Sequence, residues 1–378
     1  MLDDEPHISF KSLFIPFTTI KAALYIILIG ILVFGNMLFN GFVWDDKTFI
    51  ILNPDVYTLN IPYLFGQNLF NDTVYYRPIP ATYFATLYSL FATNPFPYHI
   101  LQLVLHIVNT ILLFKLFSSF FRKNISFILS VIFLVHPMQV ESVSYIGQTV
   151  SPLFFFFGIV GLMSLTKINK YRLAKFNGLL LLAMLTKETG IIFLFLGSLY
   201  TFLYNKSKLL LVAATSLFAV VIYLFIRIFI GNVYFAKSLL IAPIANIPLQ
   251  ERLLSVPSVI FYYFKTFFFP VDLGINQHWV ITSPIFNNFY LPLLYNVAIL
   301  ALIIWIGLLC FKKSEVMFKT YIFFTVWLLL GLAFHSQIAP LDMTVADRWF
   351  YMTMVGLLGI LGVGFELLPR NKLIYKQI

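Results

Sequence analysis

The amino-acid sequence predicts an all-α, polytopic membrane protein with about ten transmembrane helices (about nine to eleven) in a single domain over residues 1–378. Sixty percent of the residues are apolar and 11% are charged, whereas a soluble domain is about half apolar and about a quarter charged. Apolar stretches recur as far as the C-terminus, so the first one is expected to be a span and not a cleaved signal peptide. The single cysteine, Cys310, excludes an internal disulfide and a cysteine metal cage.

Basic residues gather at every second turn between the apolar stretches, and this pattern predicts the topology. Lys and Arg concentrate in the short cytoplasmic loops of membrane proteins. Placing the basic clusters on one side puts both termini in the cytoplasm; the clusters are Arg122/Lys123, Lys167 to Lys175, Lys206/Lys208, Lys312/Lys313 and Arg370 to Lys376. The expected spans are residues 20–42, 97–117, 124–136, 151–166, 172–186, 189–204, 209–230, 289–311, 318–334 and 349–368.

The stretch 176–204 contains Lys187 and Glu188 near its middle. It is therefore expected to form a hairpin whose arms, 172–186 and 189–204, meet at the outer side of the membrane. At 1.5 Å per residue each arm is about 22–24 Å long, which is shorter than a ~30 Å hydrocarbon core. Such short helices predict an outward-facing cavity formed with extracytoplasmic loops and juxtamembrane helices.

Two large extracytoplasmic regions are expected, residues 43–96 and residues 231–288. The second contains an apolar stretch, 253–272, that would reverse the later topology if it crossed the membrane. We interpret this stretch as re-entrant or interfacial.

Five polar strings are expected on the outer face: FVWDD (42–46), YYRP (75–78), HPMQVES (136–142), LTKETG (185–190) and ADRWFYM (346–352). Each string alone has a structural explanation, such as a helix cap, an interfacial arginine, a helix start, a polar turn or a local ion pair. Together they supply the side chains for group transfer from a phosphorylated lipid. A carboxylate can take a proton from an acceptor hydroxyl, and Arg and Lys can bind a phosphate that gains charge as it leaves.

Three motifs of soluble enzymes are missing from the sequence, which contains no P-loop, no GxGxxG and no HExxH. The basic residues lie at span ends and do not form a nucleic-acid-binding surface, so no nucleic-acid partner is expected. The Tyr-, Asn- and Phe-rich region 43–96 offers stacking and hydrogen-bonding groups for a sugar or an extended acceptor.

The strings FVWDD, YYRPIP, HPMQVESV, AMLTKETG and ADRWFYM, in that order, resemble those of the GT-C glycosyltransferases. The chain is similar in particular to the membrane half of the transmembrane, tetratricopeptide-containing O-mannosyltransferases. The resemblance covers roughly residues 42–190 and 335–352, and region 231–288 matches no known pattern. It implies a GT-C-like helical fold and a polyprenyl-phosphate-linked sugar such as dolichyl-phosphate mannose. It also implies inverting transfer on the extracytoplasmic or lumenal face, in a microbial plasma membrane or the endoplasmic reticulum.

The resemblance also implies roles for individual residues. Asp45 would be the catalytic base, and Asp46 would lie close to the acceptor or to a divalent metal ion that the pair could bind. The donor phosphate would contact Arg348, Lys187 and Arg77. The side chains expected to shape the site are Glu188, His136, Glu141, Asp347, Tyr351 and His106.

Two departures from that family affect the expected partners. The second acid is Asp where many relatives have Glu, which leaves the order of roles within the pair open. The chain stops about ten residues after the last expected span, without a tetratricopeptide array, so the acceptor is either a protein or an envelope glycan. Two other classes of function remain as alternatives: a transporter or flippase of lipid-linked sugars, and an oligosaccharide polymerase or ligase with a diphosphate donor.

Overall fold

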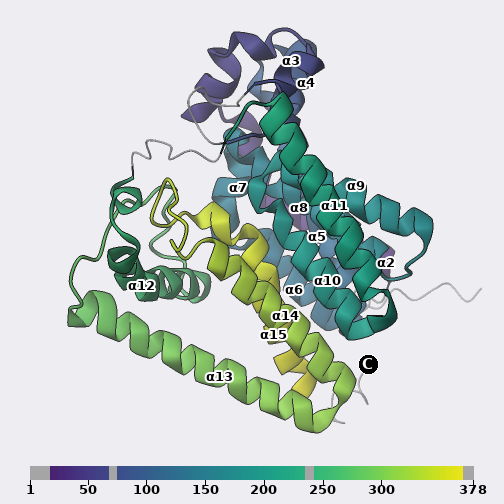
Figure 1. Ribbon diagram of the computed structural model, residues 1–378, viewed down its shortest axis with the longest axis vertical. Helices are drawn as coiled ribbons and strands as arrows, with labels where there is room; N and C mark the ends of the chain where they lie inside the picture. The colour runs from purple at the N-terminus through teal and green to yellow at the C-terminus, as the bar shows by residue number, and fades with distance from the viewer. Residues whose placement is uncertain (1–17, 68–74, 235–241, 369–378) are drawn as a thin grey trace, which may run out of the picture.

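The computed structural model describes residues 18–67, 75–234 and 242–368, and this part of the chain is a bundle of helices without a β-sheet (Figure 1). The predicted all-α membrane architecture is confirmed, because each of the ten expected spans coincides with one helix. These helices are α2 (Thr19–Phe34), α5 (Pro95–Phe117), α6 (Lys123–Val135), α8 (Val150–Ser164), α9 (Lys170–Thr186), α10 (Ile192–Tyr204), α11 (Leu209–Phe225), α13 (Leu291–Lys313), α14 (Glu315–Phe334) and α15 (Phe350–Leu367).

Seven of these helices, some of them together with the short helical turns that adjoin them, are long and apolar enough to cross a membrane. The other three are α6 and the two arms of the expected hairpin, α9 and α10. Helix α6 continues after a 54° bend into the segment Pro137–Ser144, which includes α7 (Val140–Ser144). The expected cytoplasmic termini lie outside the described residues.

Side-chain caps explain where several helices begin. The Thr18 hydroxyl accepts a hydrogen bond from the Lys21 backbone N–H at the start of α2. Asn169 and Ser314 cap α9 and α14 in the same way. Each cap satisfies one of the backbone N–H groups that have no partner in the first turn of a helix.

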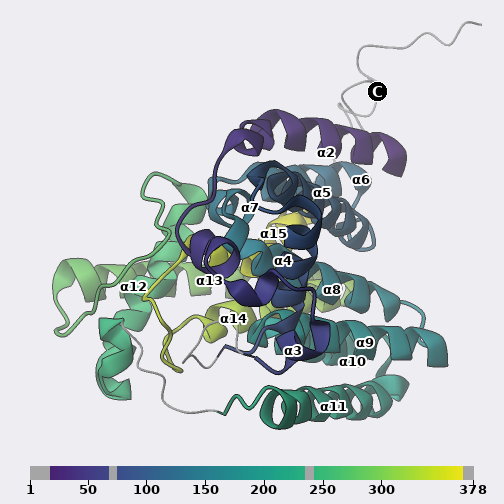
Figure 2. The same ribbon diagram turned by 90° about the horizontal axis from the view of Figure 1, so that it is seen from above.

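Helices α14 and α15 form the tightest pair in the bundle. A side chain at Gly356 would come within 2.3 Å of the Leu328 backbone nitrogen, so the two backbones approach closely only because this residue is glycine. Helix α15 lies in the middle of the bundle between α2 and α11, as Figure 2 shows. Helix α13 runs apart from the other long helices in Figure 1 and is 11% buried, against 72% for α15.

The predicted hairpin at Lys187–Glu188 is two helices, α9 and α10, joined by a turn. Gly190 permits this turn, because a side chain there would come within 2.5 Å of the Ala183 backbone. The ambiguous stretch 253–272 falls largely in α12 (Leu249–Phe268), which is not among the described helices long and apolar enough to cross a membrane. The described residues of region 43–96, which are 43–67 and 75–96, form a small helical layer with α3 (Ile61–Phe65) and α4 (Pro78–Phe91) at one end of the bundle (Figure 1).

The two ends of α15 define two different ends of the bundle. Its C-terminal turn carries Glu366, which forms a salt bridge with Arg122 and accepts a hydrogen bond from Lys313 through its backbone carbonyl. Arg348 immediately precedes its first turn, about 27 Å away for 18 residues. Two of the basic clusters thus lie opposite the polar strings, while the side of the membrane that each end faces stays a prediction.

Candidate active site

A cavity of about 500 Å³ lies at the end of the bundle where α9 ends and α15 begins. Its volume falls within the range of small-molecule sites, ~300–1,000 Å³. Four of the five polar strings contribute candidate site residues to its wall: Asp45 from the first, Arg77 from the second, Lys187 and Glu188 from the fourth, and Arg348 from the fifth. Only the string that starts at His136 is absent from the wall. Residues more than 300 positions apart in the sequence therefore meet at one site.

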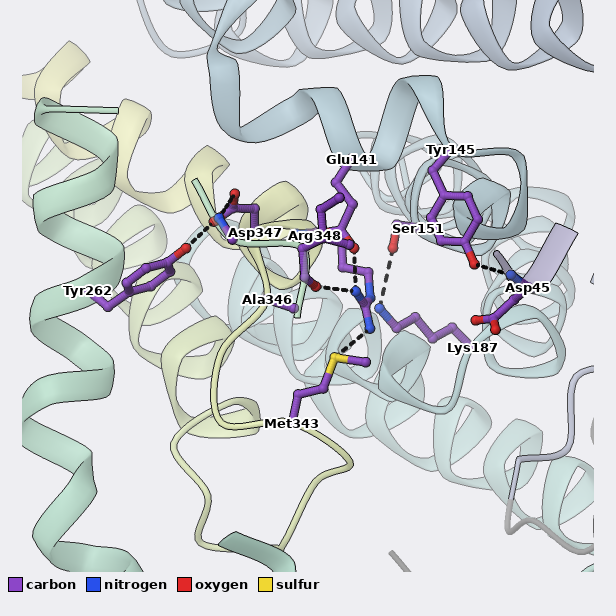
Figure 3. Close-up of polar contacts among 12 residues, drawn as sticks. Asp45, Glu141, Tyr145, Ser151, Lys187, Tyr262, Met343, Ala346, Asp347 and Arg348 are labelled. Carbon is purple, nitrogen blue, oxygen red and sulfur yellow. Dashed lines mark hydrogen bonds and ion pairs between the residues drawn. The ribbon is translucent and has the colours of Figure 1, made fainter. Parts of the chain in front are cut away.

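Arg348 is held by a buried ion pair with Glu141 (Figure 3). One Glu141 oxygen contacts Arg348 Nη1, and the other accepts the Arg348 backbone N–H at 2.9 Å. Nη1 also donates to the Ile275 carbonyl at 2.9 Å. Within the described residues, the one hydrogen-bond contact of Nη2 is with the sulfur of Met343. Because a thioether is a weak acceptor, Nη2 remains available to a stronger acceptor in the cavity.

Lys187 is a buried cation in the turn between α9 and α10. It is 7% exposed, and within the described part of the chain it forms no salt bridge. Its Nζ donates to the Ser151 hydroxyl at 3.4 Å and lies 5.4 Å from the centre of the Phe154 ring. Burial, with Arg77 and Arg348 nearby, lowers the pKa of Lys187 to about 7. A buried charge without a counterion is costly, so this position is suited to an anionic ligand.

The acidic pair divides into one buried and one exposed carboxylate. Asp46 is fully buried, and its two oxygens accept the backbone N–H groups of Val43 (2.9 Å) and Gly147 (2.6 Å). Burial raises the pKa of Asp46 to about 6. Asp45 lines the cavity, and its carboxylate points into the same space as the Lys187 side chain (Figure 3). Asp46 therefore fixes the loop that presents Asp45.

The backbone before the pair is strained. Trp44 has a φ of 45°, a left-handed conformation that is uncommon for a bulky residue. The Asp45 N–H donates to the Tyr145 hydroxyl at 3.2 Å, and the Trp44 ring packs edge-on against Tyr145. Burial and the Asp45 carboxylate raise the pKa of Tyr145, so this hydroxyl stays protonated. Such strain is typical of functional positions, where surrounding contacts hold a side chain in a defined direction.

Replacing Asp46 with Asn is expected to lower the free energy of unfolding by about 1–3 kcal/mol, because the amide can accept only one of the two N–H groups. Thermal or denaturant unfolding of the purified protein measures this effect. Asp45→Asn is the matched control and should leave stability unchanged, since its side chain is exposed. Equal stability losses in both variants would contradict the assignment of a structural role to Asp46 and not to Asp45.

Arg77 and Glu188 form a second ion pair at the cavity wall. Arg77 Nε and Nη2 both donate to one Glu188 oxygen, at 3.1 and 3.0 Å, and Arg77 stacks on the ring of Tyr75. The other Glu188 oxygen accepts the Tyr76 backbone N–H and lies 3.8 Å from Arg227. Arg77 thus already has a carboxylate partner, unlike Lys187.

Five of the six residues expected to shape the site do not line this cavity: Glu141, which binds Arg348, and His136, Asp347, His106 and Tyr351. His136 stacks on Phe267 and bonds its carbonyl through Nε2, so it anchors the end of α12. Asp347 accepts the Tyr262 hydroxyl at 2.6 Å and the Gly274 N–H at 2.9 Å, which fixes the start of α15 to the α12 region (Figure 3). His106 and Tyr351 bond each other in the bundle core, at 2.9 Å.

The acidic pair is not arranged as a set of metal ligands. Asp46 directs both oxygens to backbone amides and does not line the cavity beside Asp45. Among the described residues, no group of three His, Cys, Asp or Glu side chains is placed to hold a metal ion. The residues present therefore do not fit the metal site considered from the sequence.

The loop between α14 and α15 contributes several cavity residues that the sequence analysis missed, and two of them, His335 and Asp342, are titratable. His335 Nδ1 donates to the Gly331 carbonyl at 2.8 Å, and the ring stacks on Trp349. Burial, with Lys187 and Arg348 nearby, lowers the pKa of His335 to about 3, so the ring is neutral. The sequence signal that could have identified His335 was its position one residue beyond α14, but no known motif surrounds it.

The fold and the cavity together define a polytopic helical membrane protein with a charged cavity at one end of its bundle. Parts of the chain are similar to curated protein O-mannosyl-transferases, which confirms the resemblance predicted from the sequence. The similarity is 28% over 200 residues to one from Caenorhabditis elegans, half of this chain and 29% of that protein. It is 31% over 142 residues to protein O-mannosyl-transferase TMTC3 of Mus musculus, 35% of this chain and 15% of that protein.

A third relative, protein O-mannosyl-transferase TMTC1 of Homo sapiens, is 28% identical over 185 residues, which are 42% of this chain and 21% of that protein. The matched stretches thus span less than a third of the length of these relatives. No family model and no solved structure matches the chain.

Proposed function

We propose that the protein is a glycosyltransferase that moves a sugar from a polyprenyl-phosphate donor to an acceptor hydroxyl. The observation that carries this proposal is the set of charged residues on the wall of the cavity of about 500 Å³. There Asp45 lines the same cavity as Lys187, which forms no salt bridge within the described residues, and Arg348, whose Nη2 contacts the thioether of Met343. The distribution of basic residues supports an extracytoplasmic position for this end of the bundle. The named activity of the similar proteins supports mannose as the sugar.

The proposed reaction is a single displacement with inversion at the sugar. The acceptor oxygen forms a bond to the anomeric carbon while the bond between that carbon and the phosphate oxygen breaks, and the bonding electrons leave with the phosphate. Asp45 takes the proton of the acceptor hydroxyl. The polyprenyl phosphate changes from a monoanion to a dianion, and Lys187 and Arg348 stabilise this added charge.

An assay with purified, reconstituted protein tests the proposal. Incubation with polyprenyl-phosphate mannose and a hydroxyl-bearing acceptor should give a mannosylated product whose anomeric configuration is opposite to that of the donor. Donor that crosses the bilayer without any transfer would instead support a flippase. A product that retains the donor configuration would contradict the single displacement.

Donor affinity is expected to fall as the pH rises through about 7, because Lys187 attracts the phosphate only when protonated. A charge-assisted hydrogen bond contributes about 1.5–3 kcal/mol, so the dissociation constant should rise by about tenfold or more between about pH 6 and about pH 9. Donor binding at a series of pH values measures this. Lys187→Met should give weak binding that no longer depends on pH, and a Met variant with the wild-type pH profile would assign the effect to another group.

His335 is placed to accept a hydrogen bond from the donor sugar through Nε2, since Nδ1 already donates to Gly331. His335→Ala should raise the donor KM by about threefold to tenfold, the effect of one hydrogen bond. Monodeoxy donors provide the check: the one that lacks the partner hydroxyl should react equally well with both proteins. If every monodeoxy donor distinguishes the two proteins to the same degree, His335 does not contact the sugar. His335→Asn is the control, because its amide can keep the bond to Gly331.

A further inference from the structure

The segment that connects α6 to α8, residues 136–149, contacts both acids of the site. It contains α7 and a short helical turn at Ile146–Thr149. The Tyr145 hydroxyl accepts the Asp45 N–H at 3.2 Å (Figure 3), and the Gly147 N–H donates to Asp46 at 2.6 Å. The position of the Asp45 carboxylate in the cavity therefore depends on where this connecting segment lies.

One side chain of α5, Gln102, bonds the connecting segment at three points. It is fully buried, and its Nε2 donates to the carbonyls of Ser142 and Tyr145, both at 2.8 Å. Its Oε1 accepts the Thr149 hydroxyl at 2.6 Å. The opposite orientation of the amide would place its oxygen against two carbonyl oxygens, so the partners fix this orientation. The three bonds enclose the turn that contains Gly147.

The same face of α5 is fixed to two other helices near the site. His106 and Asn109 follow Gln102 by four and seven positions, so the three side chains share one face of the helix. Asn109 Nδ2 donates to the Pro152 carbonyl of α8 at 2.8 Å and to the Tyr351 hydroxyl of α15 at 3.2 Å. His106 Nδ1 lies 2.9 Å from that same hydroxyl. Gln102 therefore projects from a helix that is held rigidly against α8 and α15.

Building on the proposed function, we propose that Gln102 is a positioning residue for sugar transfer. It fixes the direction of the Asp45 carboxylate through Tyr145 and Gly147, although α5 contributes no residue to the wall of the cavity. A buried amide is costly unless it is hydrogen-bonded, and every bond of this amide goes to the connecting segment. The sequence analysis gave no role to Gln102, because a single glutamine in an apolar helix belongs to no motif.

Gln102→Met is expected to lower the rate of single-turnover transfer by about 10²-fold, the usual effect of displacing a reacting group by about 1 Å. Met has nearly the size of Gln but no amide, so it removes all three bonds. Donor affinity should change little, because the contacts that hold Lys187 and Arg348 do not involve Gln102. Rapid mixing of the enzyme–donor complex with acceptor measures the rate. Binding of polyprenyl-phosphate mannose measures the affinity and shows that the variant is folded.

A double variant distinguishes the positioning of Asp45 from a general loss of structure. In protein that already carries Asp45→Asn, Gln102→Met should lower the remaining rate much less than in the wild-type background, because no base is left to displace. Substitutions that act through the same group are not additive. An equal fall in both backgrounds, or a normal rate in folded Gln102→Met, would overturn the proposal.

A milder pair of variants tests the same contacts if Gln102→Met does not fold. Thr149→Val keeps the volume of the side chain but removes the hydroxyl that bonds Gln102 and the Ile146 carbonyl. It should lower the transfer rate by about threefold to tenfold, the effect of one hydrogen bond. Thr149→Ser is the matched control, because it keeps the hydroxyl and should transfer at nearly the wild-type rate. Equal rates in the two variants would overturn the proposal.

The failure of this inference is distinguishable from the failure of the proposed function. Transfer that falls with Asp45→Asn but not with Gln102→Met would overturn the positioning role and leave the glycosyltransferase intact. Absence of transfer from polyprenyl-phosphate mannose to any hydroxyl-bearing acceptor would contradict the proposed function, and this inference with it.

Discussion

Asp45→Asn is expected to lower the rate of single-turnover transfer by about 10²–10⁴-fold, the usual contribution of a general base. Asn has the same shape as Asp and keeps the backbone bond to Tyr145, but it cannot take the proton from the acceptor hydroxyl. Donor affinity should change little, because the proposed phosphate contacts are Lys187 and Arg348. Rapid mixing of the enzyme–donor complex with acceptor measures the rate.

The control for this experiment is the neighbouring acid. Asp46→Asn should mainly lower stability, so its transfer rate at a temperature where it is folded should stay much closer to that of the wild type. A near-normal rate for Asp45→Asn would show that Asp45 is not the catalytic base. The acidic pair would then serve only to end the first span.

Lys187→Met is expected to stabilise the protein without donor and to weaken donor binding by about tenfold to 150-fold. The two effects have opposite directions because the charge of Lys187 is costly in the empty cavity and favourable next to a phosphate. The folded-state pKa of about 7 lies below the ordinary value of 10.5. The destabilisation from this group is therefore complete below about pH 7 and fades as the pH rises towards 10.5.

Thermal unfolding and donor binding, both measured at pH 6, test the two halves of this prediction. Lys206→Met is the matched control, since Lys206 is exposed at the far end of α10 and should affect neither quantity. A Lys187→Met protein that is less stable than wild type would show that the lysine has a structural role. Another residue would then have to bind the phosphate.

Most of the bundle could be predicted because apolar stretches of sufficient length have few alternatives to a membrane helix. The ten expected spans are helices at nearly the predicted bounds, and seven of them are long and apolar enough to cross a membrane. The Lys187–Glu188 turn followed from the cost of a charge pair in hydrocarbon. The cavity-wall residues that belong to the five polar strings could be predicted because they are ionisable residues near the ends of expected spans. Their meeting at one cavity was expected because short helices end below the membrane surface.

The division of roles between Asp45 and Asp46 could not be predicted, because two adjacent acids are equivalent in sequence. The strained backbone at Trp44 and the amides of Val43 and Gly147 separate them. His136, which was expected to shape the site, does not line the cavity, and the sequence could not show this for a similar reason. Its ring pairs with the carbonyl of Phe267, a contact across 131 positions that no local pattern encodes.

We expect the cavity of about 500 Å³ to bind the donor with its phosphate between Lys187 and Arg348. A cryo-electron microscopy map of the protein with bound polyprenyl-phosphate mannose tests this binding site. Phosphate density should contact Lys187 Nζ and Arg348 Nη2, with the sugar in the same cavity beside Asp45. Phosphate density at the opposite end of α15, beside Arg122 and Lys313, would contradict it.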